Sequence, residues 1–162
     1  MEKTVSVTDI VQACKNNTSN CGELLALIEL LRLNRFEKVE WIAGNRFHKG
    51  HYDIKCGNLK IEVKACNRDN QWAMREREKE PNFDSGFDRV NPKNFNYVIC
   101  VSFNNELKDT KFFIFSSEES QKFEDSKWKS ARGMKTIEVK KHKNDELNKI
   151  IASSRDAWSK IE

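Results

Sequence analysis

Polar and apolar residues alternate most clearly between positions 51 and 65, in the segment HYDIKCGNLKIEVKA. Two short alternating runs flank Gly57-Asn58, a dipeptide suited to the two-residue turn of a β-hairpin. Successive side chains of a strand point to opposite faces, so the pattern predicts a hairpin with one apolar and one charged face. The register fixed by this turn predicts the facing pairs Cys56 with Leu59, Lys55 with Lys60, Ile54 with Ile61, Asp53 with Glu62, and His51 with Lys64.

The charged face of this hairpin places two carboxylates, Asp53 and Glu62, opposite each other. Facing residues have Cβ atoms about 5 Å apart, and like charges placed there destabilise a sheet. A hard divalent cation that prefers oxygen ligands, such as Mg²⁺, would relieve the repulsion. Lys64 projects from the same face and reaches the same volume. The alternative is a solvated hairpin face, in which Lys55, Lys60 and Lys64 neutralise the two carboxylates without a metal.

The rest of the chain combines segments of helical spacing with segments that alternate or are continuously apolar. In chain order, we predict a short helix over 8–14, a helix over 20–32 with Asn20 as N-cap, a strand over 37–43, the hairpin, a helix over 71–80, buried strands over 95–103 and 111–115, a short helix starting at 116–119, and an edge strand over 134–140. An amphipathic helix over 144–161, capped by Asn144, closes the chain and packs on the core or forms a dimer interface.

Aromatic residues in the polar segments suggest two different roles. Residues 82–89 are predicted to form an exposed loop, whose Phe83 and Phe87 would stack on bases or cover a site. Phe123 and Trp128 are predicted to anchor the short helical element that precedes them. The first pair is therefore a candidate for substrate contact, and the second pair for core packing.

Two glutamates outside the hairpin, Glu23 and Glu138, are further candidates for the same chemistry. Glu23 follows Asn20 by three residues and could be half of a capping box, a purely structural role. Leucines four, seven and eight residues further on place Glu23 on or beside the core-facing stripe of its helix. Glu138-Val139-Lys140 repeats the spacing of Glu62-Val63-Lys64, but no hairpin aspartate precedes it, so we assign it no chemistry.

Composition sets broad limits on the class of protein. The chain has 162 residues, of which 38% are hydrophobic and 33% charged, which suits one domain with its own core. A net charge of +4 permits a nucleic-acid partner without demanding one. Without a membrane-length apolar run or a signal-peptide pattern, we expect a cytoplasmic protein with no membrane partner. No Cys-x-x-Cys pair occurs, and Cys56, Cys66 and Cys100 are predicted to be small buried thiols.

Asp53, the tripeptide Glu62-Val63-Lys64 and the helical Gly22-Glu23 together resemble the PD-(D/E)XK nuclease superfamily, closest to its Holliday-junction resolvase and Mrr-like branches. The resemblance covers about residues 20–103, and Tyr52 stands where the family signature has proline. It implies a restriction-endonuclease-like αβββαβ core, an α/β fold whose mixed central sheet is flanked by helices. We expect a single nuclease-like domain over 1–162, with its core at about 20–116 and the helix at about 144–161 packed on it.

The resemblance also implies a site. Asp53, Glu62 and the backbone carbonyl of Val63 would hold Mg²⁺, with Mn²⁺ able to substitute, and Glu23 would contact the metal directly or through water. Lys64 would orient or activate the attacking water and stabilise the charged transition state. The predicted nucleic-acid contacts are Arg46, His48, Lys49 and Arg68.

The function that these residues imply is metal-dependent endonucleolytic hydrolysis of DNA, of a restriction, repair or junction-resolving type. Two cuts in a duplex normally need two active sites, which favours a homodimer. Duplex, branched and single-stranded DNA and RNA are all candidate substrates. The alternatives are a catalytically inactive nucleic-acid-binding domain of the same fold and an interaction module with a mixed-charge hairpin.

Overall fold

The computed structural model describes residues 17–42 and 52–162 of the chain. Its strands are β1 (Val39–Trp41), β2 (Ile54–Cys56), β3 (Leu59–Asn67), β4 (Ser85–Val90), β5 (Tyr97–Phe103), β6 (Lys111–Ser116), β7 (Glu124–Asp125) and β8 (Lys135–Val139). Its helices are α2 (Thr18–Leu33), α3 (Gln71–Lys79), α4 (Ser117–Ser120) and α5 (Asp145–Ser154), with 3₁₀ turns η1 (Pro92–Asn94), η2 (Lys129–Ala131) and η3 (Trp158–Lys160). The predicted helix at 8–14, the loop residues Arg46, His48 and Lys49, and His51 lie outside the described residues.

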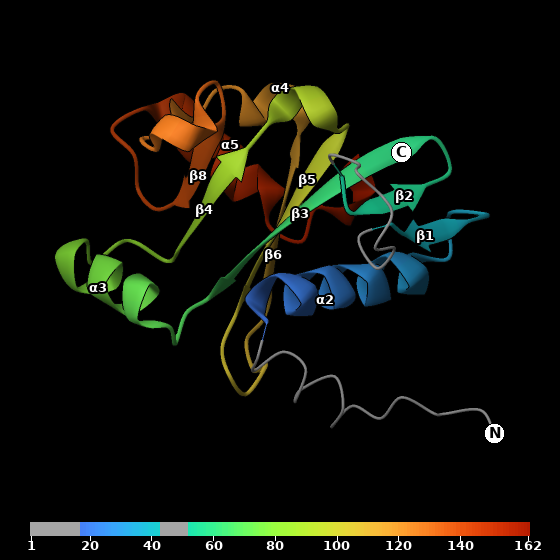
Figure 1. Cartoon of the computed structure of the whole chain (residues 1–162), viewed down its shortest axis with the longest axis horizontal. Helices are drawn as coiled ribbons and strands as arrows, with labels where there is room; N and C mark the ends of the chain where they lie inside the picture. The colour runs from blue at the N-terminus through green and yellow to red at the C-terminus, as the bar shows by residue number, and fades with distance from the viewer. Residues whose placement is uncertain (1–16, 43–51) are drawn as a thin grey trace.

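A five-stranded mixed sheet in the order β1-β2-β3-β5-β6 forms the centre of the molecule (Figure 1). β1, β2 and β3 are antiparallel neighbours, β5 runs parallel to β3, and β6 runs antiparallel to β5. The predicted α/β class, with a mixed sheet and flanking helices, is therefore confirmed. None of the helices in the described residues is long and apolar enough to cross a membrane.

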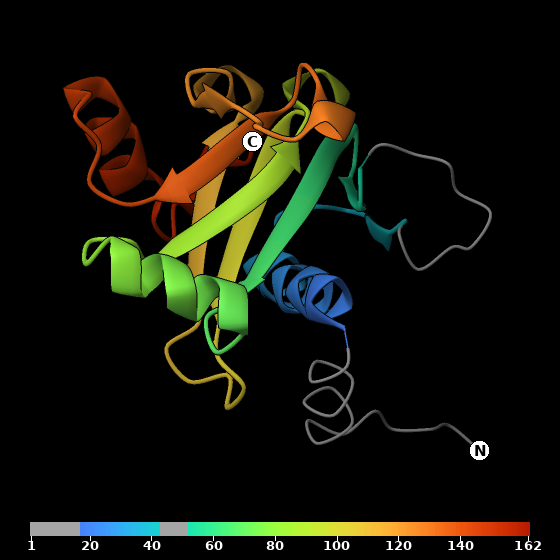
Figure 2. The same ribbon diagram turned by 60° about the vertical axis from the view of Figure 1, so that its left-hand side comes forward.

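The central sheet separates two apolar cores. Alternate side chains of β5 show this directly, because Ile99 and Val101 pack toward α2 while Val98 and Cys100 face the opposite side. The opposite side is covered by a second, three-stranded sheet in the order β4-β8-β7, which Figure 2 shows crossing in front of the central strands. A strand covered on both faces needs apolar residues at nearly every position, as predicted for 95–103. The predicted burial of Cys56, Cys66 and Cys100 as free thiols is also confirmed.

α2 begins three residues earlier than predicted. Asn17 is the N-cap, and its side chain accepts the N–H of Asn20 at 3.1 Å. Glu23 is therefore in the second turn of the helix, too far from the cap for a capping box. Gly22 lies directly against Ala65 of β3, where a Cβ would meet the Ala65 side chain inside contact distance. The missing side chain at Gly22 thus lets the helix approach β3 closely beside Glu23.

Residues 83–88 are buried or partly buried, contrary to the predicted exposed loop, while Asn82 and Arg89 at the two ends are exposed. They enter β4, which pairs antiparallel with β8 through Ser85 opposite Val139. Phe83 and Phe87 are only 4% and 2% exposed and belong to the interior of the fold. Helix α3 agrees with its predicted limits, and Trp72 at its start packs over Gly86. The spacing of apolar residues did not indicate this strand, because small and polar residues occupy buried positions of β4.

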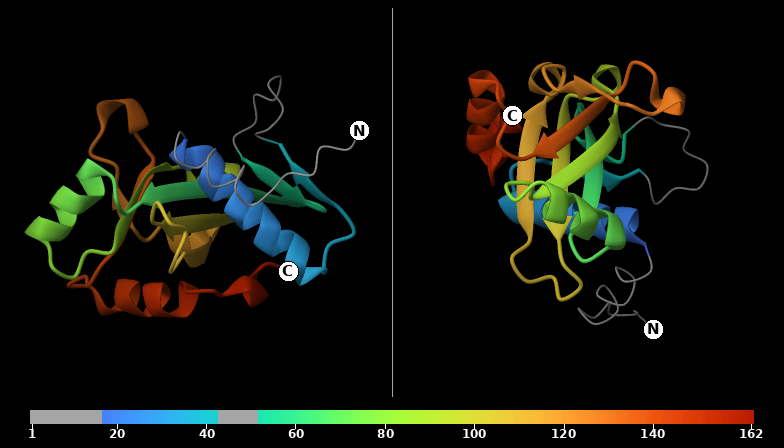
Figure 3. Two further views of the ribbon diagram at one scale, coloured as in Figure 1. Left: turned by 90° about the horizontal axis from the view of Figure 1, so that it is seen from below. Right: turned by 90° about the vertical axis from the view of Figure 1, so that its left-hand side faces the viewer.

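Three further predictions in the C-terminal half are wrong. β8 lies between β4 and β7 and is not an edge strand. Trp128 is 62% exposed, so of the two predicted anchors only Phe123 is buried. The closing helix has its predicted cap, Asn144, but ends at Ser154 and not at 161. The chain leaves the helix because the Asp156 N–H donates to Phe112 at the edge of the sheet, at 2.9 Å. α5 itself runs beside β6 (Figure 3).

Candidate functional site

Asp53 is held at the point where the hairpin leaves the central sheet. The predicted register is confirmed through Ile54 opposite Ile61, and the regular ladder ends there. The Asp53 N–H donates to the Ile61 carbonyl at 2.9 Å, while its carboxylate accepts the Val63 N–H at 2.7 Å. The predicted direct pairing with Glu62 is thus replaced by a bent strand end. The side chain of Asp53 caps the edge of β3 next to Glu62.

Glu62 and Lys64 project from the same face of β3, as their spacing predicts. The Lys64 Nζ lies 2.8 Å from the Glu62 Oε1. Their side chains are 15% and 25% exposed respectively, so the ion pair is largely sheltered but still reaches solvent. The alternative interpretation, a solvated face on which Lys55, Lys60 and Lys64 neutralise both carboxylates, agrees with the structure only in the pairing of Lys64 with Glu62.

Glu23 is brought to the same place by α2. It is 7% exposed, and its Oε2 accepts the indole N–H of Trp41 at 2.8 Å. Trp41 belongs to β1, so the helix, the first strand and the hairpin all contribute to the site. The spacing along the helix indicated the buried position of Glu23. Nothing in the sequence indicated its bond to Trp41, because it depends on how α2 packs across the sheet.

The three carboxyl groups share an environment that disfavours ionisation. Burial raises the pKa of Glu62 to about 7; the charge of Lys64 opposes this rise, and the charges of Asp53 and Glu23 add to it. Burial also raises the pKa of Asp53, against the Val63 hydrogen bond and Lys64. Burial raises the pKa of Glu23 as well, opposed by the Trp41 hydrogen bond and increased by Asp53. A further cation in this volume would stabilise all three ionised groups.

Two adjoining cavities meet at Asp53, Glu62, Lys64 and Arg89. The first, of about 380 Å³, is completed by Ser19, Glu23, Val63, Ala65, Gly86, Phe87 and Asp88. The second, of about 370 Å³, is completed by Tyr52, Asn91, Asn94, Ser130 and Met134. The carboxylates therefore lie where two hollows join, and a substrate could extend to either side of them.

Arg89 is a site residue that sequence reasoning missed. It has a left-handed backbone conformation, with φ of 56°, where the pairing of β4 with β8 becomes irregular. Such irregularities turn a side chain away from the regular face of a strand. Arg89 is exposed and lines both cavities. No local signal could have found it, since residues 82–89 did not resemble a strand.

Arg68 lies elsewhere, although it was predicted to contact nucleic acid. Its guanidinium is buried, with the residue 6% exposed, and it lines neither cavity. It donates to the carbonyl and the hydroxyl of Ser102 at 3.0 and 2.9 Å, and to the carbonyl of Asp109 at 2.8 Å. These bonds tie the end of β3 to the turn after β5, so the position of Arg68 does not support the predicted contact.

The donors at the site are of the type that binds hard cations. Within residues 17–42 and 52–162, no group of three or more His, Cys, Asp or Glu side chains is arranged closely enough to hold a metal ion. Asp53, Glu62 and Val63 nevertheless line the same cavity, and carboxylate and carbonyl oxygens are ligands that suit Mg²⁺ or Mn²⁺. The negative charges of Asp53 and Glu23 raise the pKa of Glu62, and a divalent cation would offset this repulsion. This is a second reason why a divalent cation fits here.

We predict that Glu62→Gln makes the protein more stable at pH 8. The Glu62 pKa is higher in the folded protein, about 7, than its ordinary value of 4.5. The folded state therefore binds the proton more tightly, and the free energy of unfolding falls as the pH rises from about 4.5 to about 7. In EDTA the variant should exceed wild type by about 1–3 kcal/mol at pH 8 and match it near pH 4.5.

Urea denaturation at both pH values measures this difference. Glu40→Gln is the control, because the hydrogen bond from Lys38 lowers the pKa of Glu40 and removing that carboxylate should give no gain at pH 8. Equal stability of Glu62→Gln and wild type at pH 8 would show that the carboxylate is not held in a disfavoured ionised state.

Comparison with known proteins adds no assignment: no family model, no curated protein and no solved structure matches the chain.

Proposed function

We propose that the protein is a metal-dependent endonuclease that hydrolyses phosphodiester bonds in DNA. The observation that carries the proposal is the convergence of Asp53, Glu62 and Lys64 with Glu23 around one cavity. Paired carboxylates beside a lysine form the constellation of the PD-(D/E)XK nucleases that this chain resembles. The raised pKa values of the carboxyl groups are typical of a functional site.

The arrangement of elements supports a restriction-endonuclease-like fold. α2 precedes three antiparallel strands, α3 follows them, and a buried strand parallel to β3 comes next in the central sheet. This is the αβββαβ order that the resemblance implies. β4 is inserted between α3 and β5 and joins the second sheet, where it supplies Arg89 to the site.

Asp53, Glu62 and the Val63 carbonyl would hold Mg²⁺ or Mn²⁺, with Glu23 in contact directly or through water. A bound divalent ion would neutralise charge developing on the phosphate and lower the pKa of a bound water. The Val63 N–H fixes the Asp53 carboxylate in place, and the Trp41 indole does the same for Glu23. These two hydrogen bonds restrict the rotamers of the acidic groups before any ligand arrives.

Lys64 supplies the positive charge nearest to the reacting phosphate in this proposal. Its ammonium group is a compact donor that can hold a water and a phosphate oxygen beside the carboxylates. Its contact with Glu62 keeps it at the cavity, and its partial exposure leaves it accessible to substrate. Arg89 would bind a neighbouring phosphate, because a guanidinium matches phosphate geometry with two parallel hydrogen bonds.

A nucleic-acid-binding domain without cleavage is the second candidate. The ion pair between Lys64 and Glu62 favours it, because the charge of that carboxylate is compensated without a metal. Binding of DNA with a strong salt dependence, and no cleavage in Mg²⁺ or Mn²⁺, would select this candidate.

The experiment that tests the nuclease proposal is incubation of the protein with plasmid, linear duplex, branched and single-stranded DNA. Each substrate is tested in Mg²⁺, Mn²⁺ and EDTA. We expect cleavage of at least one substrate in Mg²⁺ or Mn²⁺ and none in EDTA. Cleavage that persists unchanged in EDTA would contradict the role of the metal.

A further inference from the structure

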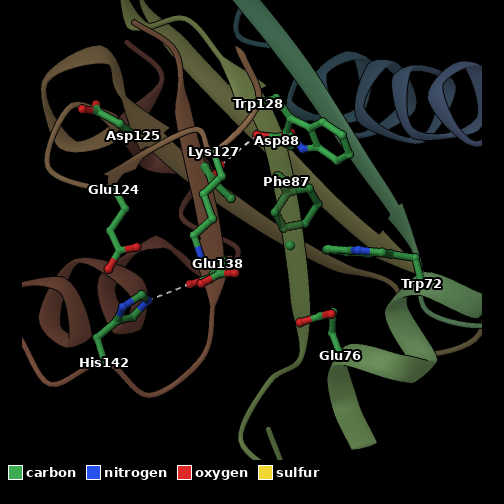
Figure 4. A pocket seen from close by; sticks show the side chains of 12 residues that line it. Trp72, Glu76, Phe87, Asp88, Glu124, Asp125, Lys127, Trp128, Glu138 and His142 are labelled. Carbon is green, nitrogen blue, oxygen red and sulfur yellow. Dashed lines mark hydrogen bonds between the residues drawn. The ribbon is translucent and has the colours of Figure 1, made fainter. Parts of the chain in front are cut away.

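Another cavity, of about 460 Å³, lies between α3 and the second sheet, and it shares Gly86, Phe87 and Asp88 with the cavity beside Glu23. Its apolar wall is formed by Trp72, Phe87 and Trp128, and Figure 4 shows the two indoles on either side of Phe87. Trp72 and Trp128 are 50% and 62% exposed, an unusual state for residues of this size. Pockets of about 300–1,000 Å³ with aromatic walls are typical of ligand sites.

The position of Trp72 is built into the fold. Gly86 of β4 leaves room for its ring, since a Cβ there would lie 2.8 Å from the indole. The indole also meets Phe83 edge-to-face at 6.0 Å between ring centroids. One aromatic wall of the cavity is thus fixed by packing, while its outer surface stays accessible.

The polar lining of this cavity is strongly acidic. It consists of Glu76, Asp88, Glu124, Asp125 and Glu138, with Lys127 and His142. Three of these carboxylates form ion pairs with lysines outside the cavity lining: Glu76 with Lys79 at 3.0 Å, Asp125 with Lys135 at 2.8 Å and Glu138 with Lys140 at 2.7 Å. Asp88 and Glu124 have no such lysine partner within the described residues. Hydroxyl groups of Ser126 and Thr136 lower the pKa of Asp88 despite its burial, so it stays ionised at neutral pH. The cavity therefore presents negative charge beside aromatic faces.

We propose that this cavity binds the arginine side chain of a basic segment in a partner protein. A guanidinium is planar, stacks on indole faces and is more weakly hydrated than an ammonium group. Its donors also match carboxylate oxygens in pairs. Single-stranded nucleic acid, whose bases also stack on tryptophan, is disfavoured because its phosphates would approach the five carboxylates. None of Glu23, Asp53, Glu62 and Lys64 lines this cavity, so arginine binding here does not require nuclease activity.

The test is a titration of intrinsic tryptophan fluorescence with the peptide Ac-Gly-Arg-Gly-Arg-Gly-NH₂, and with its lysine and glutamine counterparts. We expect saturable binding of the arginine peptide, weaker binding of the lysine peptide and no binding of the glutamine peptide. Trp128→Ala should weaken arginine-peptide binding about 3- to 30-fold. Met74→Ala is the control, since Met74 is 51% exposed on α3 and does not line the cavity.

Three results would overturn the proposal. The first is equal binding of the arginine and glutamine peptides, or no saturable binding of the arginine peptide. The second is unchanged affinity in Trp128→Ala, which leaves the exposed indole without a role. The third is tight binding of a single-stranded oligonucleotide that Trp128→Ala abolishes and the arginine peptide does not displace, which would make the tryptophans a platform for bases.

Discussion

Replacing Lys64 with alanine is expected to reduce DNA cleavage at least about 100-fold while the protein stays folded. The lysine is the only cation of β3 that lines both cavities beside the carboxylates in the described residues. In the proposed mechanism, loss of its ammonium removes both the donor to the phosphate and the group that orients the water. Cleavage rates at saturating Mg²⁺ measure the effect, and circular dichroism checks the fold.

Loss of Lys64 also removes the charge that lowers the pKa of Glu62. The assay is therefore run at pH 8.5 as well as pH 7, so that protonation of Glu62 is not mistaken for loss of the lysine. Lys140→Ala is the matched control, because Lys140 forms the same Glu-x-Lys ion pair with Glu138 on β8, at 2.7 Å. Activity of Lys64→Ala equal to that of Lys140→Ala at both pH values would remove Lys64 from the mechanism.

Gly22→Ala is expected to destabilise the protein by about 1–3 kcal/mol. In an ordinary exposed helix the same change stabilises by about 1 kcal/mol, because alanine is the better helix former. Here the added methyl group would overlap the Cβ of Ala65. Helix α2 must then shift from β3, and it would carry Glu23 with it. Urea denaturation measures the loss of stability.

A double variant separates this steric effect from other causes. Adding Ala65→Gly removes the methyl group that Gly22→Ala meets, so the double variant should recover much of the stability lost in the single variant. Asn20→Ala, on the exposed side of the same helix, is the control and should be neutral within about 0.5 kcal/mol. If Gly22→Ala were as stable as the Asn20→Ala control, the close approach of α2 to β3 would be refuted.

The hairpin was predictable because its signals are local. Gly57 has the positive φ of 58° that the turn needs, and the alternation on either side sets the faces of both strands. Glu62 and Lys64 followed from the same period of two. The point at which Asp53 leaves the ladder was not predictable, because it depends on a side-chain hydrogen bond to Val63 that competes with regular pairing.

The second sheet was missed for a different reason. β4 buries small and polar residues such as Ser85 and Gly86, so its strand character comes from tertiary contacts and not from hydrophobic periodicity. Because this strand was not predicted from the sequence, Arg89 was not among the predicted site residues. The end of α5 at Ser154 also depends on a tertiary contact, because Arg155 pairs with Phe113 of β6. The helical spacing of apolar residues continues to Ile161 and gives no sign of this contact.

The most direct test of the central claim compares cleavage by wild type, Asp53→Ala and Glu62→Ala, purified in parallel and assayed in Mg²⁺, Mn²⁺ and EDTA. We predict metal-dependent cleavage by wild type that both variants lose, because each removes one oxygen donor from the strand edge where Asp53 and Glu62 meet. Cleavage by both variants at the wild-type rate would contradict the account, and would place the activity at another site or in a contaminating enzyme.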